Sequence, residues 1–242
     1  MTDDGPGARP PQERGWPAGG AVARSFPREV LAADTLAAAR ALLGARLVRD
    51  ALPGLTARRV GRIVEVEAYL GLDDRASHAR MGPTDRNRVM FGPPGIAYVY
   101  RVYGMHDCLN VVTEASTRPA AVLVRAVEPV EGADAMREAR AVAAGRRRSA
   151  PTGGRVPRPI PNARLAAGPG RVAAAFGIDR THTGLDLCDP ASSLRLEARP
   201  PDEPAPEIAA TPRIGISYAP EPWASVPWRF IVPRSPSLSR RS

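Results

Sequence analysis

The chain changes to a hydrophobic period of two between residues 59 and 127, and this change restricts its fold more than any other feature. Apolar and polar side chains alternate there over four short runs, and Gly104 and Arg118-Pro119 act as turns between them. Such alternation is typical of β-strands. The predicted strands cover residues 59–70, 96–103, 108–113 and 120–127.

Helical patterns flank these strands. Residues 27–43 repeat apolar side chains at helical spacing and end before Gly44. Residues 129–144 return to this pattern, with acidic residues early and arginines late, as the helix dipole favours. A short helix is predicted from Gly168 to about Phe176, and its first backbone N–H groups could hold a phosphate. Closing strands are expected at 194–198, 213–218 and 228–232, which together indicate an α+β fold, a mixed α/β domain.

Composition indicates one domain with two tails. At 242 residues the chain is long enough for one substantial core. Residues 1–24 contain acids, prolines and glycines without the apolar segment of a secretory signal, and we expect them to be disordered. Residues 145–161 are rich in Arg, Pro and Gly and should form an exposed loop. The domain itself is expected at 25–234, with a loose tail at 235–242.

The charge of the chain points to nucleic acid as a partner. There are 34 basic and 25 acidic residues, which gives +9, and every basic residue is arginine because the chain contains no lysine. A GC-rich genome would explain the choice of arginine but not the net charge. A pI near 10.7 suits binding to nucleic acid and, with less support, to an anionic membrane surface.

Cysteines and histidines give no sign of a disulfide framework or a metal site. Cys108 and Cys188 are the only cysteines, and they form no Cys-x-x-Cys motif. With them and His78, His106 and His182 as the available ligands, the usual zinc spacing is missing, so no metal and no cofactor are expected. No apolar run is long enough to span a membrane. These features favour a cytoplasmic protein with reduced thiols.

Two glutamates and a tyrosine stand at alternate positions of the first predicted strand. Glu65, Glu67 and Tyr69 therefore share one face, and Val64, Val66 and Ala68 take the other. If that face lines a cleft, Glu67 could activate a water molecule, and the nearby Glu65 could raise one of the two pKa values. The alternative is a pair of solvated glutamates on an open sheet, and this feature taken alone favours that alternative.

Three tyrosines lie within six positions of a chain that has only 5 % aromatic residues. Tyr98 and Tyr100 fall on one face of the second strand, and Tyr103 stands at its end beside Gly104, where it could project. A projecting tyrosine could enter a base stack, while Tyr69 and Tyr100 could enclose a flipped base. Tyr98 is read as a core residue. His78 could contact a phosphate or a base, or be an ordinary loop histidine.

Three longer runs carry a family resemblance. RIVEVEAYLGLDDRASHAR, TDRNRVMFGPPGIAYVYRVYGMHDCLNVV and AVLVRAVEPVEG closely resemble the alkyladenine (3-methyladenine) DNA glycosylases, also called alkylpurine-DNA glycosylases. GPGR and PRIGI match more loosely, and the matches follow in order across residues 27–233. The resemblance implies a curved antiparallel sheet surrounded by helices, with the tyrosine hairpin protruding towards double-stranded DNA.

The resemblance also implies a role for each matching residue. Glu67 would position and deprotonate the attacking water, and Arg125 would help to hold that water. Asn110 would exclude the amino group of normal guanine, and Tyr103 would fill the gap in the duplex. The pocket for the flipped base would be formed by Tyr69, His78 and Tyr100. His106 and Asp107 depart from the aromatic residues of many relatives, so DNA contact there is expected to be weaker.

The sequence thus predicts a monofunctional DNA glycosylase whose partner is double-stranded DNA that contains damaged purines. Its expected substrates are 3-methyladenine, 7-methylguanine, hypoxanthine and ethenoadenine, and its expected setting is the bacterial nucleoid in the cytoplasm, as a monomer. Without lysine there is no side-chain amine for a Schiff base, so strand cleavage is not expected. The alternatives are a non-catalytic DNA-damage binding module and a carbohydrate hydrolase that uses Glu65 and Glu67 as its carboxylate pair.

Overall fold

The computed structural model describes residues 24–52, 57–115, 118–145 and 159–240. The described strands pair antiparallel in one sheet and the helices pack around it, as in an α+β fold, so the predicted fold class is confirmed. The N-terminal tail before Arg24, most of the Arg/Pro/Gly loop, including Arg146 to Arg148, and the last two residues lie outside the described residues.

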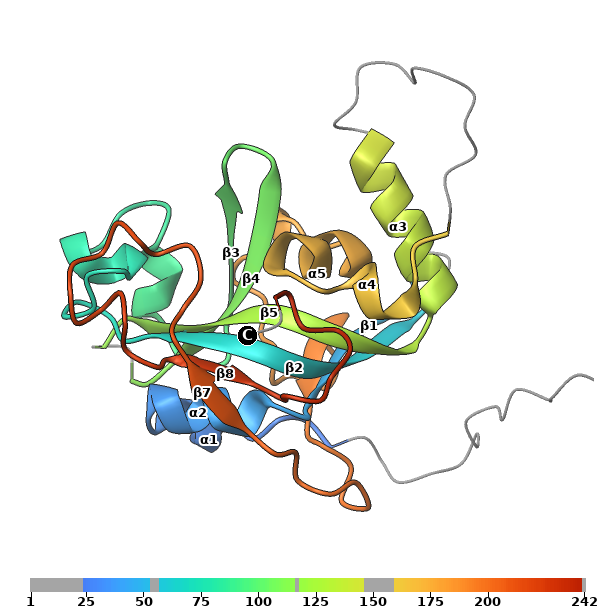
Figure 1. Cartoon of the computed structure of the whole chain (residues 1–242), viewed down its shortest axis with the longest axis horizontal. Coiled ribbons are helices and arrows are strands. Elements are labelled where there is room, and N and C mark those ends of the chain that lie inside the picture. The colour runs from blue at the N-terminus through green and yellow to red at the C-terminus, as the bar shows by residue number, and fades with distance from the viewer. Residues whose placement is uncertain (1–23, 53–56, 116–117, 146–158, 241–242) are drawn as a thin grey trace, which may run out of the picture.

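One antiparallel sheet forms the centre of the domain (Figure 1). Its main path runs β3-β4-β5-β2-β1-β6, and β8 pairs with β2 and with β7. The strands are β1 (Arg46–Arg49), β2 (Arg59–Tyr69), β3 (Ala97–Val102), β4 (His106–Thr113), β5 (Ala120–Glu131), β6 (Leu194–Glu197), β7 (Ala209–Thr211) and β8 (Arg229–Ile231).

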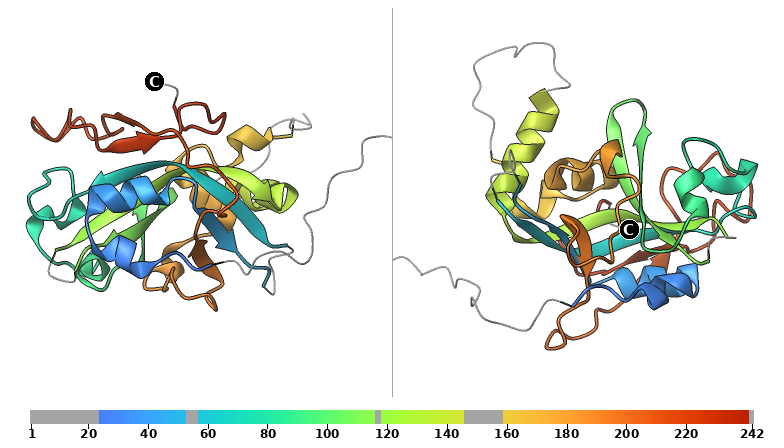
Figure 2. Two further views of the ribbon diagram at one scale, coloured as in Figure 1. Left: turned by 90° about the horizontal axis from the view of Figure 1, so that it is seen from below. Right: turned by 180° about the vertical axis from the view of Figure 1, so that it is seen from behind.

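Helices pack on both sides of β2 and β5. Helices α1 and α2 lie on one side, and α3, α4 and α5 lie on the other, with the β3–β4 hairpin projecting on that second side (Figures 1 and 2). The helices are α1 (Arg28–Ala32), α2 (Thr35–Leu42), α3 (Ala133–Gly145), α4 (Asn162–Leu165) and α5 (Pro169–Phe176); the 3₁₀ turns are Ser77-capped His78–Met81, Arg88–Phe91 and Arg180–His182. No helix in the described part of the chain is long and apolar enough to cross a bilayer.

The two N-terminal helices follow directly from the sequence. Asp34 caps α2 by accepting a hydrogen bond from Ala37 N–H at 2.8 Å. Leu31 in α1 and Leu42 in α2 are fully buried in the main core. The predicted helical segment 27–43 is therefore confirmed as two short helices.

The sequence placed the start of α3 too early. The helical pattern predicted it from Pro129, but residues 128–131 still pair with β2, so β5 is longer than expected. Gly132 makes the turn into the helix with a positive φ of +73°, and a Cβ there would lie 2.2 Å from the Arg58 carbonyl oxygen. Only glycine fits this close approach, and it sets the boundary between strand and helix.

Two expectations for the C-terminal third are wrong. Residues 213–218 form no strand; the short strand β7 lies earlier, and residues 213–218 form a loop that returns over β2. The described part of the tail expected to be loose, residues 235–240, packs against the domain, with Ser235, Ser237 and Leu238 buried. Alternation failed here because a few apolar residues in a Pro-rich segment can anchor a loop as well as a strand.

Candidate active site

Two compensating bulges place the charged residues of β2 and β5. Ile63 pairs with Val127 and Glu65 with Ala126, so β2 has an extra residue at Val64. The next pair joins Val66 to Val124, so β5 has an extra residue at Arg125. Bulges next to active sites re-aim side chains.

The bulges leave Glu65 and Glu67 on one face, as predicted, but they separate Val64 from Val66. Arg125 contacts both Glu65 and Glu67, so these two carboxylates do lie on one face, with Tyr69 beside them. Val64 does not join Val66 in the main core. It packs in a separate small cluster with Ala126, Ile231 and Leu238.

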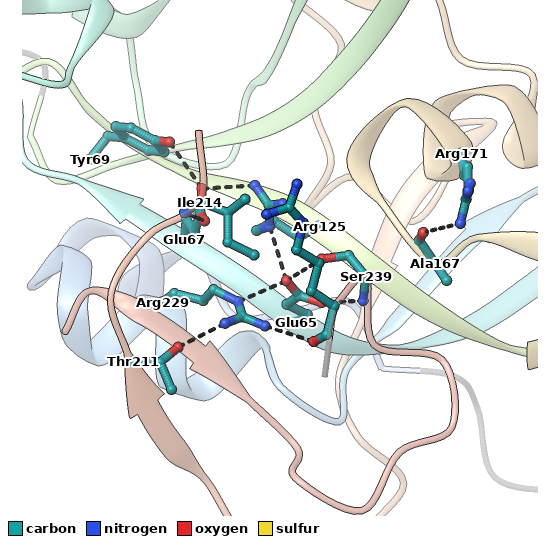
Figure 3. Close-up of polar contacts among 11 residues, drawn as sticks. Glu65, Glu67, Tyr69, Arg125, Ala167, Arg171, Thr211, Ile214, Arg229 and Ser239 are labelled. Atoms are coloured by element: carbon teal, nitrogen blue, oxygen red, sulfur yellow. Dashed lines mark hydrogen bonds and ion pairs between the residues drawn. The ribbon is translucent and has the colours of Figure 1, made fainter. Parts of the chain in front are cut away.

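Glu67 is enclosed by hydrogen-bond donors. Its Oε2 accepts from the Tyr69 hydroxyl at 3.0 Å and from Arg125 at 3.1 Å, and its Oε1 accepts from the Ile214 backbone N–H at 2.7 Å. Neither Glu67 nor Glu65 has exposed surface, so the alternative of solvated glutamates is wrong. Figure 3 shows Arg125 lying between the two carboxylates.

The two carboxylates differ in acidity. Burial raises the pKa of Glu67, and Arg125, the Ile214 N–H and Tyr69 offset only part of that rise. Burial also acts on Glu65, but hydrogen bonds from Ser239 and the charges of Arg125 and Arg229 bring its pKa below the ordinary value. The expectation that one of the pair has a raised pKa therefore holds, with burial rather than the neighbouring carboxylate as the main cause.

An aromatic wall faces this carboxylate pair. The rings of His78 and Tyr100 meet edge to face with centroids 4.3 Å apart, and Tyr98 lies 5.4 Å from Tyr100. Tyr98 is only 1 % exposed, as expected of a core residue, but its hydroxyl also lies 3.1 Å from His78 Nδ1. Burial, with the nearby Arg86 and Arg80, lowers the pKa of His78 to about 4, so this imidazole is neutral at pH 7.

Tyr103 stands at the tip of the β3–β4 hairpin. It lies beyond the end of β3, in a turn with a positive φ of 50°, and is 83 % exposed. A left-handed backbone is uncommon for a residue with a side chain. The turn with Gly104 therefore holds the ring out from the domain, as the sequence predicted.

Asn110 lies in β4, below the hairpin tip. It is 4 % exposed, and its Nδ2 donates to the Tyr98 carbonyl at 3.1 Å and to the Cys108 carbonyl at 3.4 Å. These two bonds fix the orientation of the amide in the wall of the cavity.

These residues surround a cavity of about 830 Å³. The predicted site residues Tyr69, His78, Tyr100, Tyr103, Asn110 and Arg125 all line it, while Glu67 lies behind Tyr69 and Arg125. We call the hydrogen-bonded group of Glu65, Glu67, Arg125 and Arg229 the floor of the cavity. The start of α5 closes one side with residues 168–171. Arginines gather along the same lining: Arg86, Arg101, Arg140, Arg164, Arg171 and Arg240.

The two residues that depart from the family pattern have partners in the structure. Arg101 donates two hydrogen bonds to Asp107, at 3.1 and 3.0 Å, which offsets the negative charge at the hairpin. His106 packs against α5 so closely that a Cβ on Gly170 would lie 2.9 Å from His106 Cβ. His106 thus joins the hairpin to the helix start.

Sequence reasoning missed three contributors to the carboxylate site. Ile214 lies within the PRIGI run, which matches the family, but this run was predicted to be a strand whose N–H groups pair within the sheet. Arg229 donates to Glu65 at 2.9 Å, and Ser239 donates to it twice at 2.7 Å. No pattern marked either residue, because the contact depends on how the C-terminal segment folds back. Among the described residues, no group of three or more His, Cys, Asp or Glu side chains gathers to hold a metal ion.

Comparison with known proteins agrees with this geometry. The model of the methylpurine-DNA glycosylase family matches residues 29–236. Two proteins named “Putative 3-methyladenine DNA glycosylase” are similar to the chain. The one from Methanocella arvoryzae is 45 % identical over 219 residues, covering 90 % of this chain and 96 % of its own, and the one from Myxococcus xanthus is 45 % identical over 217 residues, covering 89 % and 93 %.

A buried carboxylate at the floor of an aromatic cavity whose lining carries several arginines fits a hydrolase that acts on DNA. The chain belongs to the methylpurine-DNA glycosylase family. It is therefore an enzyme that hydrolyses N-glycosyl bonds and removes alkylated purines in base excision repair. Neither the non-catalytic binding module nor the carbohydrate hydrolase agrees with this membership. Arg125 also forms ion pairs with both Glu65 and Glu67, so it occupies the place between the two carboxylates that a sugar would need.

Proposed function

We propose that this enzyme releases 3-methyladenine from double-stranded DNA, using a water molecule activated by Glu67. One observation carries the proposal: Glu67 is fully buried, has a raised pKa and is held by Arg125 and the Ile214 N–H at the floor of the aromatic cavity. A carboxylate in that environment is a stronger base than one in water.

In the proposed reaction the flipped nucleotide presents C1′ to the floor of the cavity. The water oxygen bonds to C1′ as the bond between C1′ and the base nitrogen breaks, and that electron pair leaves with the base. Glu67 accepts the water proton, and its charge stabilises the oxocarbenium-like sugar. A 3-methylated adenine is already cationic, so it leaves as a neutral base without further protonation.

The aromatic wall would select and hold the flipped base. Tyr69, His78 and Tyr100 would stack on it and contact it, and the fixed amide of Asn110 would exclude the amino group of normal guanine. Tyr103 would enter the duplex where the nucleotide has left. The neutral lesions hypoxanthine and ethenoadenine need a proton as they leave, so we expect them to react more slowly than 3-methyladenine and 7-methylguanine.

The rim of the cavity would bind the DNA backbone. Arginines suit bidentate contacts with phosphate, and the first N–H groups of α5 face the same cavity. We propose that a single copy of the chain acts on the duplex, at the bacterial nucleoid in the cytoplasm. Glycosylase action then leaves an abasic site, and strand cleavage does not accompany it because the chain has no lysine.

The test compares wild type with Glu67→Gln. Both are incubated with methylated DNA and with duplexes that carry one hypoxanthine or one ethenoadenine, and released base is measured before and after alkali. We expect Glu67→Gln to lower the rate of base release by roughly 10² to 10⁴-fold. With wild type, strand breaks should occur only after alkali, because base release leaves an abasic site. An unchanged rate would exclude Glu67 as the base.

A further inference from the structure

The C-terminal segment, residues 235–240, folds back against the floor of the active site. Leu238 is 5 % exposed and packs with Val64, Ala126 and Ile231 in the cluster that the β2 bulge creates. This anchor puts the next residue, Ser239, beside Glu65 (Figure 3). The family match ends three residues before Ser239, at position 236.

Ser239 gives Glu65 half of its hydrogen bonds. Its backbone N–H donates to Oε2 and its hydroxyl to Oε1, both at 2.7 Å. The other two donors are Arg125 Nε at 3.0 Å and Arg229 Nε at 2.9 Å, both to Oε1. Four hydrogen bonds satisfy a carboxylate that has no exposed surface. The two from Ser239 are the shortest, and short bonds to an ionised group are the strong ones.

Glu65 in turn fixes the orientation of Arg125. The guanidinium places Nε against Glu65 and one terminal nitrogen against Glu67, at 3.0 and 3.1 Å. Its planar fork can make both contacts only while both carboxylates keep their places. Arg229 is tied elsewhere as well, to the Thr211 hydroxyl and the Arg240 carbonyl, so it belongs to the same C-terminal frame.

We propose that Ser239 is a positioning residue for the glycosylase reaction: its two hydrogen bonds hold Glu65 in the place from which that carboxylate orients Arg125 against Glu67. This inference rests on the proposed role of Glu67 as the base. Ser239 itself touches no reacting atom in this scheme. Its effect reaches the water through Glu65, Arg125 and Glu67 in turn.

The inference has a pH signature. The charged groups that face Glu65 are Arg125 from β5, Arg229 from β8 and Glu67 from its own strand. Burial pushes the pKa of Glu65 up, and the Ser239 bonds are the largest influence that pushes it down. Without the hydroxyl, Glu65 takes up a proton at higher pH and stops holding Arg125. Activity should then fall at a higher pH than in wild type.

The experiment measures single-turnover base release from methylated duplex DNA between pH 5 and 9, together with DNA affinity. We expect Ser239→Ala to lower the rate about tenfold at pH 7, the scale of one lost hydrogen bond to a charged group, and to move the acid limb to higher pH. Affinity for DNA should stay within about twofold. Ser239→Thr keeps the hydroxyl and should restore the wild-type profile.

Ser235→Ala is the matched control. Ser235 lies in the same segment, and its hydroxyl donates to Glu128 at 3.0 Å and accepts from the Ser237 N–H at 3.2 Å, away from Glu65. It should leave the rate and the pH profile unchanged. If Ser239→Ala does not fold, Glu65→Gln removes the charge directly and should lower the rate in the same direction.

Two failures can be told apart. If Glu67→Gln is inactive but Ser239→Ala keeps the wild-type rate and acid limb, the positioning role is wrong and the proposed function stands. A slower Ser239→Ala with an unshifted acid limb would also overturn the positioning role, since it indicates general weakening of the fold. Full activity of Glu67→Gln would overturn the proposed function first.

Discussion

The floor of the cavity and the hairpin above it differ in burial and in bonding. On the floor, the residues Glu65, Glu67, Arg125 and Arg229 are at most 7 % exposed, and their side chains are joined by hydrogen bonds. At the hairpin tip, Tyr103 is 83 % exposed. The two regions are joined by β4 and β5, which pair from Asn110 to Thr113.

This contrast separates the two tasks that we propose for the enzyme. Charge stabilisation works best where donors and acceptors are fixed before the substrate arrives and water is excluded. Entry into a base stack requires a side chain that no other part of the protein holds. Substitutions on the floor should therefore cost stability and rate together, whereas those at the tip should cost rate on duplex DNA alone.

The largest effect is expected behind the floor, at the ion pair of Asp74 and Arg213. Arg213 donates to both Asp74 oxygens and lies over the Tyr69 ring at 4.7 Å, directly before Ile214, and both side chains of the pair are fully buried. Asp74→Asn leaves the guanidinium without its counter-charge, so we expect the free energy of unfolding to fall by about 3–5 kcal/mol. Urea unfolding measures this loss.

An exposed pair of the same chemistry supplies the control. Asp85 pairs with Arg88 at 2.7 Å, with side chains 97 % and 76 % exposed. Because water screens such a pair, Asp85→Asn should change stability by less than about 0.5 kcal/mol. Equal losses from Asp74→Asn and Asp85→Asn would contradict the view that the floor is the stable, pre-organised region.

Arg125→Lys is expected to have the next largest effect. Lysine keeps the positive charge but lacks the fork that reaches Glu65 and Glu67 at once. We expect single-turnover base release to slow by roughly 10 to 100-fold, with a smaller loss of stability than Asp74→Asn. Arg88→Lys, on the surface, should release base at the wild-type rate. A fully active Arg125→Lys would mean that charge alone, without the fork, suffices on the floor.

Tyr103→Ala tests the other region. Its side chain makes no stabilising contribution to the core, so thermal unfolding should be unchanged, while kcat/KM on a duplex should fall by roughly tenfold because the gap in the stack is not filled. Tyr103→Phe keeps the ring and should behave like wild type. On single-stranded DNA with the same lesion the Ala variant should lose little. An equal loss on both substrates would argue against a role in the duplex.

The strands on the hairpin side could be predicted from the sequence because apolar and polar residues alternate there and each turn is marked. Gly104 marks the tip and Arg118-Pro119 the next turn, and β2, β3 and β4 lie close to their predicted ranges. The boundary at Gly132 and the loop at 213–218 were misjudged, since both depend on contacts with residues distant in the chain.

The candidate site shows the same division. Alternation was enough to put Glu65 and Glu67 on one face, but it could not show that they are buried, because burial depends on the C-terminal segment. Ser239 lies 174 positions from Glu65 and reaches it only because Leu238 finds the cluster around Val64. That cluster exists because of a bulge, and a bulge breaks the alternation on which the prediction of faces relies.

The smallest effect concerns the neutral histidine of the aromatic wall. The pKa of His78 is about 4 in the folded protein, below the ordinary 6.5, so the unfolded chain binds this proton first as the pH falls. The stability that neutral His78 contributes is thus present above pH 6.5 and is lost between pH 6.5 and about 4. The slope from one such group is at most ~1.4 kcal/mol per pH unit.

His78→Gln isolates this contribution, because the amide can replace the hydrogen bond to the Tyr98 hydroxyl but does not titrate. Urea unfolding of wild type and variant at pH 7, 6 and 5 should show wild type losing more stability on acidification. Other titrating groups, the two buried glutamates among them, act equally in both proteins and cancel in the difference. If wild type and His78→Gln lose the same stability on acidification, the aromatic wall, although less enclosed than the floor, accepts a charged imidazole.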